Sequence, residues 1–173
     1  MDEDKKRNRD SEQPPAGVVR EHRGRYRFTL GKDEASSIIG RGGIGRVLLV
    51  EDKHLDRQVA LKELLPESDE GGAELESKGS STRAVDRFLR EARITGQLEH
   101  PNIVPVHELG QREDGTLYYT MKLVRGQTLS AAVRACAKQV DRLKLLAHFV
   151  DLCQAVAYAH DRGVIHRDIK PAN

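Results

Sequence analysis

Residues 164–173 have the sequence Val164-Ile165-His166-Arg167-Asp168-Ile169-Lys170-Pro171-Ala172-Asn173, in a predicted loop that follows a predicted helix. Two apolar residues anchor the start of the loop, and an aspartate, a lysine and an asparagine follow at short spacing. Asp168 can orient an attacking hydroxyl group and accept its proton, Lys170 can neutralise charge on a phosphoryl group in transfer, and Asn173 offers an amide oxygen to Mg²⁺. We expect His166 to pack and hydrogen-bond so that it holds the loop, rather than to act as a base.

A glycine-rich segment lies upstream, with the sequence Ile39-Gly40-Arg41-Gly42-Gly43-Ile44-Gly45-Arg46-Val47. It contains the pattern G-x-G-x-x-G-x-V, in which residues without side chains let backbone amides lie close over phosphates. The pattern alone is a weak signal. A dinucleotide-binding fold uses the same glycines, but there the cluster opens a helix, whereas here it lies between two predicted strands. A plain glycine hairpin is the other alternative.

Lys62 is a lone cation at the end of the apolar segment Val59-Ala60-Leu61-Lys62. A buried ammonium group needs a fixed anionic partner. Glu91, on the helix predicted to follow, can supply one carboxylate if it faces the sheet, and ATP phosphates can supply the remaining negative charge. The alternatives are an edge lysine whose ammonium group reaches solvent and a glutamate on a solvated helix face.

Hydrophobic periodicity predicts a five-stranded antiparallel sheet with one helix in the first part of the chain. The expected strands lie at 26–30, 47–50, 58–64, 103–109 and 116–124. Apolar residues at helical spacing predict a helix from about Val85 to Leu98, which His100-Pro101-Asn102 ends. A short helix from Thr128 to about Ala137 follows, and a longer helix carries apolar residues from Leu146 to His160 along one face.

Composition and charge limit the class of protein. The 173 residues include 29 basic and 27 acidic residues, a net charge of +2, which gives no indication of a nucleic-acid or membrane-surface partner. No run approaches the roughly 18 apolar residues of a membrane span, so the cytoplasm is the expected location. Residues 1–23 are predicted to be a disordered leader, and residues 66–82 a mobile, solvated insertion. Cys136 and Cys153 lack metal-binding spacing and are expected to be buried thiols.

Taken in their order along the chain, these motifs resemble those of the protein kinase family, specifically the bacterial eukaryotic-like (Hanks-type) serine/threonine protein kinases. The matching segments, within residues 26–173, are the glycine loop, Val59-Ala60-Leu61-Lys62, Phe88-Leu89-Arg90-Glu91-Ala92, His100-Pro101-Asn102-Ile103-Val104 and the loop at 166–173. The resemblance implies an α+β, protein-kinase-like fold. Residues 24–124 would form the N-lobe, with the five-stranded antiparallel sheet and one helix. Residues 125–173 would leave the hinge and begin the C-lobe, as far as the catalytic loop.

The resemblance also implies which residues bind ATP. The glycines would cover its phosphates, and Lys62 would hold the α- and β-phosphates while paired with Glu91. The side chains of Ile39, Val47 and Ala60 would enclose adenine. A gatekeeper would lie at the back of the pocket, and two hinge residues would bond the adenine edge through their backbone. In sequence order the expected residues are Ile39, Gly40, Gly42, Gly45, Val47, Ala60, Lys62, Glu91, Met121 (gatekeeper), Leu123 and Val124 (hinge).

For the catalytic loop, the resemblance implies that Asp168 is the catalytic base, with Lys170 beside it and Asn173 as a ligand of Mg²⁺. Lys170-Pro171 resembles the serine/threonine subfamily. The implied activity is phosphoryl transfer from ATP to serine or threonine hydroxyl groups of a protein substrate.

Two features depart from the family pattern. Ile44 occupies the tip of the glycine loop, where the family usually has an aromatic residue, methionine or a small residue, and we expect it to soften closure of the loop. The D-F-G motif, the activation segment and A-P-E do not occur in the 173 residues. We therefore expect an incomplete catalytic domain, inactive alone, with the rest of the C-lobe or a sensor domain encoded elsewhere. The alternative is a non-catalytic nucleotide-binding or interaction half-kinase, although such a module has no chemical need for the full set of catalytic residues.

Overall fold

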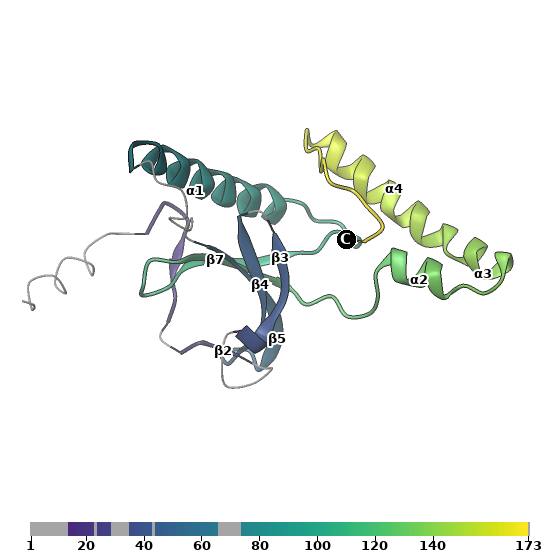
Figure 1. Cartoon of the computed structure of the whole chain (residues 1–173), viewed down its shortest axis with the longest axis horizontal. Helices are drawn as coiled ribbons and strands as arrows, with labels where there is room; N and C mark the ends of the chain where they lie inside the picture. The colour runs from purple at the N-terminus through teal and green to yellow at the C-terminus, as the bar shows by residue number, and fades with distance from the viewer. Residues whose placement is uncertain (1–13, 23, 29–34, 43, 66–73, 173) are drawn as a thin grey trace, which may run out of the picture.

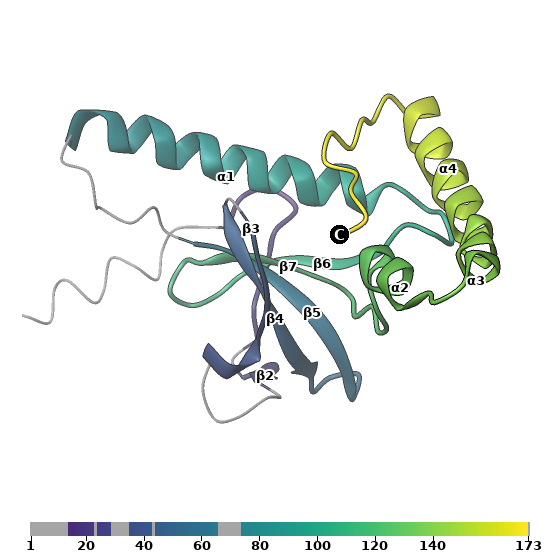
Figure 2. The ribbon, with the colours of Figure 1, turned by 45° about the vertical axis from the view of Figure 1, so that its right-hand side comes forward.

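The computed structural model describes the chain except for residues 1–13, 23, 29–34, 43, 66–73 and 173. The N-terminal part forms a curled sheet with one long helix, and three further helices lie to one side of it (Figures 1 and 2). The strands are β1 (Val19–Arg20), β2 (Tyr26–Phe28), β3 (Ile38–Gly42), β4 (Gly45–Asp52), β5 (Arg57–Leu64), β6 (Val106–Gln111) and β7 (Leu117–Lys122). The α-helices are α1 (Glu74–Gly96), α2 (Leu129–Ala135), α3 (Gln139–Lys144) and α4 (Leu146–Asp161), and a 3-10 turn (Ala35–Ser37) precedes β3.

The sheet contains seven strands, in the order β1-β6-β7-β5-β4-β2, with β3 paired to β4 beside this path. The five predicted strands correspond to β2, β4, β5, β6 and β7, which are joined by antiparallel pairs. The prediction omitted two strands: β1, which pairs with β6 in parallel, and β3, which pairs with β4.

The predicted strand at 26–30 is confirmed for Tyr26–Phe28, which forms β2 and pairs with the end of β4 through Tyr26–Asp52 and Phe28–Val50. Residues 29 and 30 lie outside the described residues. The strand directly before the glycine turn is β3, which the prediction missed. Because the turn closes with Gly42 opposite Gly45, the first strand of this hairpin has to lie directly before the glycines.

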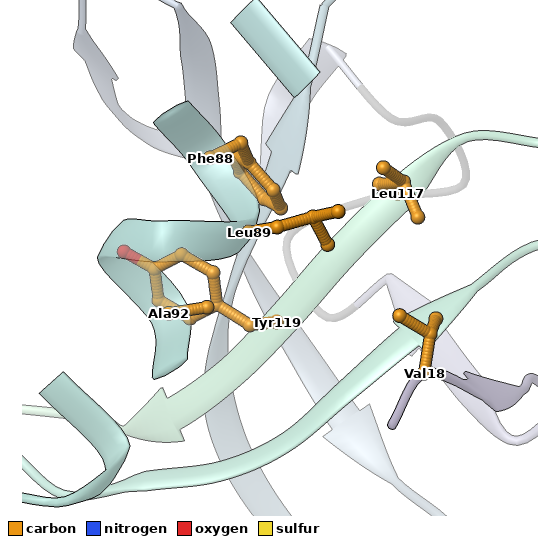
Figure 3. Packing of buried hydrophobic residues seen from close by; sticks show 6 residues of the cluster. All are labelled: Val18, Phe88, Leu89, Ala92, Leu117 and Tyr119. Carbon is orange, nitrogen blue, oxygen red and sulfur yellow. The ribbon is translucent and has the colours of Figure 1, made fainter. Parts of the chain in front are cut away.

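Part of the predicted disordered leader is ordered. Val18 is 7% exposed and belongs to the core cluster against α1, as Figure 3 shows. The carbonyl oxygen of Ala16 accepts a hydrogen bond from Arg93 at 2.6 Å, and the Glu21 N–H donates to Gln111 at 2.9 Å. One apolar side chain and a few backbone hydrogen bonds thus hold a segment whose composition is polar. Residues 1–13 of the predicted leader lie outside the described residues.

The helix α1 is longer than predicted, because it begins at Glu74 rather than near Val85. The C-terminal part of the predicted insertion, residues 74–82, is therefore helical, and residues 66–73 lie outside the described residues. Residues 74–82 include two glutamates, a leucine and a lysine, which are favourable helix formers, together with one glycine and four hydroxyl residues, which are less favourable.

Two apolar clusters cover opposite faces of the sheet. On the face that packs against α1, here called the inner face, the buried residues are Val18, Phe88, Leu89, Ala92, Leu117 and Tyr119 (Figure 3). On the opposite, outer face they are Leu48, Val50, Val59, Leu61 and Tyr118, covered in part by Tyr26 and Phe28 of β2. Alternation along the strands separates the two sets, since successive side chains point to opposite faces.

The outer face also holds a buried polar network that the sequence did not predict. Arg25 donates to both carboxylate oxygens of Asp52, at 3.1 and 3.2 Å, and to Glu108 at 2.5 Å. The hydroxyl groups of Tyr26 and Tyr118 donate to the other oxygen of Glu108, at 3.2 and 3.1 Å. Asp52 is only 1% exposed. The network joins the segment before β2 to the middle of the sheet.

The last three helices are attached through the segment between α1 and β6. The Glu99 N–H donates to the hydroxyl oxygen of Tyr158 at 3.0 Å, and the side-chain amide of Asn102 donates to the Asp151 carbonyl at 3.4 Å. The rings of His100 and Tyr158 lie 5.1 Å apart. The motif that was used to predict the end of a helix therefore also joins the sheet region to α4.

Apolar residues of α4 remain exposed. Leu146, Phe149 and Val150 are each more than half exposed. Cys153 is exposed and Cys136 is only partly buried, so the prediction of two buried thiols is wrong, because the helix face that carries Cys153 has no covering element among the described residues. No helix in the described part of the chain has the length and hydrophobicity to cross a membrane.

Candidate active site

The glycine-rich segment forms the tight hairpin between β3 and β4. Gly42 lies opposite Gly45, and Gly40 lies opposite Val47. Gly45 has no room for a side chain, because a Cβ atom there would lie 2.2 Å from the carbonyl oxygen of Glu63 on β5. The segment does not open a helix, so the arrangement of a dinucleotide-binding fold is excluded.

The strand register brings four predicted site residues to the inner face of the sheet. Val47 on β4 pairs with Lys62 on β5, and Ala60 on β5 pairs with Met121 on β7. Directly paired residues share one face, and so do residues two apart on one strand. These four side chains therefore border one common region, on the same side of the sheet as α1.

Lys62 and Glu91 form an ion pair that links β5 to α1. The Lys62 Nζ lies 2.5 Å from the Glu91 Oε1, and the two side chains are 17% and 38% exposed. The predicted pairing is confirmed. The alternatives, an edge lysine and a solvated glutamate, are wrong because the helix packs its acidic side chain back against the strand.

Tyr119 completes this site. Its hydroxyl group donates to the same Glu91 oxygen at 2.8 Å, and its ring centroid lies 5.6 Å from the Lys62 Nζ. Burial acts to raise the pKa of Glu91, but the hydrogen bonds from Lys62 and Tyr119 outweigh it and hold the pKa below its ordinary value of 4.5. Burial and the Glu91 charge raise the pKa of Tyr119, which therefore stays a hydrogen-bond donor.

Sequence reasoning missed Tyr119, although a signal was present. Leu117, Tyr119 and Met121 alternate along one strand, and all three contact the inner-face cluster. This alternation places the aromatic residue, two positions before the gatekeeper candidate, on the same face of the sheet as Lys62.

The expected adenine-binding edge carries exposed apolar side chains. Ile39 lies at an irregularity in β3 and is 47% exposed, and Val124 is 67% exposed where the chain leaves β7. Leu123, which lies between the end of β7 and Val124, is half-buried. Ile44, at the tip of the hairpin, packs against the inner-face cluster.

The loop after α4 presents Asp168 and Lys170 to solvent. The Lys170 Nζ lies 3.0 Å from both carboxylate oxygens of Asp168, and the side chains are 53% exposed for Lys170 and 66% for Asp168. The His166 Nδ1 accepts the backbone N–H of Asp168 at 3.3 Å, which supports the expected holding role. Arg167 has a φ of 66°, a left-handed conformation that costs energy in a residue with a side chain.

The loop is also tied to α2. The backbone N–H of Ser130, in the first turn of α2, donates to the Pro171 carbonyl at 2.7 Å. In Figures 1 and 2 the segment after α4 turns back between this helix and the sheet. Asn173, the predicted ligand of Mg²⁺, lies outside the described residues.

Comparison with known proteins decides the family. The family described as the protein kinase domain matches residues 34–173. This chain belongs to the protein kinase family. The order of motifs that indicated a kinase, and the α+β kinase-like fold expected from it, are both confirmed.

Curated relatives are bacterial serine/threonine kinases. The kinase chain is 38% identical over 146 residues to serine/threonine-protein kinase PknD of Protochlamydia amoebophila, covering 78% of this chain and 14% of the relative. It is 43% identical over 136 residues to serine/threonine-protein kinase PknJ of Mycobacterium tuberculosis, covering 79% of this chain and 21% of the relative. The chain thus spans about a fifth or less of the length of these relatives.

Solved kinase structures have the same fold. The kinase domain of PknI from Mycobacterium tuberculosis aligns with a TM-score of 0.57 at 28% identity, covering 93% of this chain and 57% of that one. The apo form of PpkA-294 aligns with a TM-score of 0.66 at 24% identity, covering 94% of this chain and 57% of that one. The second similarity supports the fold alone.

Proposed function

We propose that this protein transfers the terminal phosphoryl group of ATP to serine or threonine hydroxyl groups of protein substrates. The observation that carries the proposal is the ion pair between Lys62 and Glu91 on the inner face of the sheet. Partial burial of two charges costs desolvation energy, which their mutual attraction only partly offsets. A site that uses the ammonium group to bind nucleotide phosphates accounts for this arrangement.

In the proposed ATP site, the hairpin backbone at Gly40, Gly42 and Gly45 covers the phosphates while Lys62 binds them. The side chains of Ile39, Val47 and Ala60 enclose adenine, Met121 closes the back of the pocket, and the backbone of Leu123 and Val124 binds the polar edge of the base. Apolar side chains left exposed at Ile39 and Val124 support this assignment, because a planar apolar ligand would cover them.

In the proposed catalytic loop, Asp168 orients the substrate hydroxyl group and accepts its proton. Lys170, held against Asp168 in the structure, moves its charge toward the phosphoryl oxygens. When bound, ATP supplies the phosphoryl group and Mg²⁺ neutralises charge that develops on it.

The residues present are compatible with Mg²⁺. The described residues contain no cluster of three acidic, histidine or cysteine side chains for a metal ion. Proteins usually hold Mg²⁺ through one or two oxygen ligands together with substrate phosphates, so such a cluster is not required. We propose that Asn173 supplies one of these oxygens.

Nucleotide binding tests the proposal first. We expect Lys62→Met to weaken binding of Mg²⁺ and a non-hydrolysable ATP analogue, measured by calorimetry, by about tenfold or more, because a charge-assisted contact to phosphate is lost. The matched control is Lys138→Met, which removes an exposed lysine before α3. Equal affinity of wild type and Lys62→Met would refute the assigned site.

Phosphoryl transfer tests the reaction itself. Transfer to a basic protein substrate is measured for the full-length protein. Asp168→Asn is expected to abolish transfer while nucleotide binding persists. Nucleotide binding without any Asp168-dependent transfer would favour the non-catalytic half-kinase. We infer that the reaction takes place in the cytoplasm, where ATP is available.

A further inference from the structure

A basic pocket lies at the end of the sheet where β5 begins and β7 ends. Its volume is about 480 Å³, and it is lined by Arg57, Gln58, His107, Lys122, Leu123 and Arg125. Three of these six side chains are cations, one is a histidine and none is acidic. Cations gathered around a hollow produce a positive potential that attracts anions.

The strand register explains how these residues meet. Lys122 lies opposite Val59 in the last pair of β5 and β7, two residues from Arg57. His107 lies at an irregularity in β6, where the register shifts between Val106 and Glu108. The pocket thus collects side chains from three strands and from the segment that leaves β7.

Protein groups only partly compensate the three cations. The Arg57 Nε lies 4.0 Å from the nearest Asp52 oxygen, and Asp52 already accepts two hydrogen bonds from Arg25. Arg125 donates to the neutral amide oxygen of Gln58 at 2.5 Å. Within the described part of the chain, the Lys122 ammonium group has neither an ion pair nor a hydrogen bond. All three cations therefore retain capacity for an anion.

The remaining lining residues favour a phosphate that carries an organic group. Burial and the Arg57 charge lower the pKa of His107, against an opposing effect of Asp52, so the neutral imidazole can donate one N–H. Leu123 contributes an apolar wall. The planar guanidinium groups of Arg57 and Arg125 match the geometry of phosphate oxygens.

We propose that this pocket binds the phosphate group of a phosphate monoester, at a site separate from the proposed ATP site. Arg57, Lys122 and Arg125 surround the phosphate oxygens, and Leu123 contacts the organic part. Leu123 also belongs to the segment proposed to bind adenine, so the two sites adjoin at the end of β7.

Titration of the whole chain with inorganic phosphate and with O-phosphoserine, followed by NMR at constant ionic strength, tests the proposal. We expect saturable shifts at the amides of Lys122 and Leu123 and at the His107 ring. The pKa of His107 is expected to rise on binding, because a nearby dianion favours the imidazolium form. O-phosphoserine is expected to bind more tightly than inorganic phosphate, and equal binding of the two would overturn the assignment of a phosphate monoester.

Variants separate this pocket from the ATP site. The double variant Arg57→Gln and Lys122→Gln is expected to bind phosphate about tenfold more weakly or worse, since two charge-assisted contacts are lost. Lys138→Gln, the exposed control, and Lys62→Met are expected to keep wild-type affinity. Shifts that fail to saturate, or binding that is lost in Lys62→Met and kept in the double variant, would overturn the proposal.

Discussion

Two groups of charged residues, one on each face of the sheet, are held in different ways. On the outer face, Asp52 is almost fully buried and meets Arg25, which also binds Glu108, so the charges compensate one another within the protein. On the inner face, Lys62 and Glu91 form a pair whose glutamate is 38% exposed. A closed, buried network stabilises the fold, whereas a partly open pair leaves its cation able to bind a ligand. Substitutions on the two faces should therefore affect different properties.

The largest expected effect is on stability, from Asp52→Ala on the outer face. This variant removes one of the two acidic partners of Arg25, which keeps Glu108, so we expect a cost of about 3 kcal/mol, at the lower end of the cost of breaking a buried pair. Chemical denaturation measures the loss. Nucleotide affinity of the folded fraction should remain that of the wild type.

The neighbouring Glu51 provides the matched control. It pairs with Arg27, whose side chain is 64% exposed, so Glu51→Ala should cost at most about 1 kcal/mol. Equal destabilisation by Asp52→Ala and Glu51→Ala would show that the buried network contributes no more to stability than an exposed ion pair.

A smaller, pH-dependent effect is expected from Glu91→Gln on the inner face. The pKa of folded Glu91 lies below 4.5, so its charge stabilises the folded state above that pH, and the contribution is lost as the pH falls through the folded value. Wild type should be more stable than Glu91→Gln at neutral pH, with the difference shrinking below about pH 4.5. Denaturation at several pH values measures it. A difference that stays constant down to pH 3 would contradict the assigned pairing.

The smallest effect is expected from Tyr119→Phe, which removes one hydrogen bond to Glu91 and keeps the packed ring. The expected loss of stability is about 1 kcal/mol. We also expect a small rise in the pKa of Glu91, because one donor to its carboxylate is lost. An NMR titration of the glutamate carboxyl group follows this change, and an unaltered pKa would show that Lys62 alone positions Glu91.

Local sequence was sufficient to predict those parts of the candidate site whose residues are close together in the chain. The glycine hairpin, the apolar strand that contains Lys62 and the loop with Asp168 could each be recognised from a few adjacent residues. The pairing of Lys62 with Glu91 was also predictable, since one helix follows the strand and a partly buried ammonium group needs a carboxylate. The strand β3 was missed because its sequence, two isoleucines followed by Gly-Arg-Gly, shows no alternation of apolar and polar residues.

The sequence by itself determined the family, the kinase-like order of strands and helices, and the chemical types in the candidate active site, because these follow from short motifs in a set order. Only the tertiary structure decided that Tyr119 joins Glu91, that Arg25 reaches Glu108 across 83 positions of sequence, and that the basic pocket forms. Such contacts depend on strand order and register, which bring distant residues together. No local sequence pattern predicts these contacts, because each of the polar side chains could equally well be solvated. Its partner is known only when the sheet brings the two residues together.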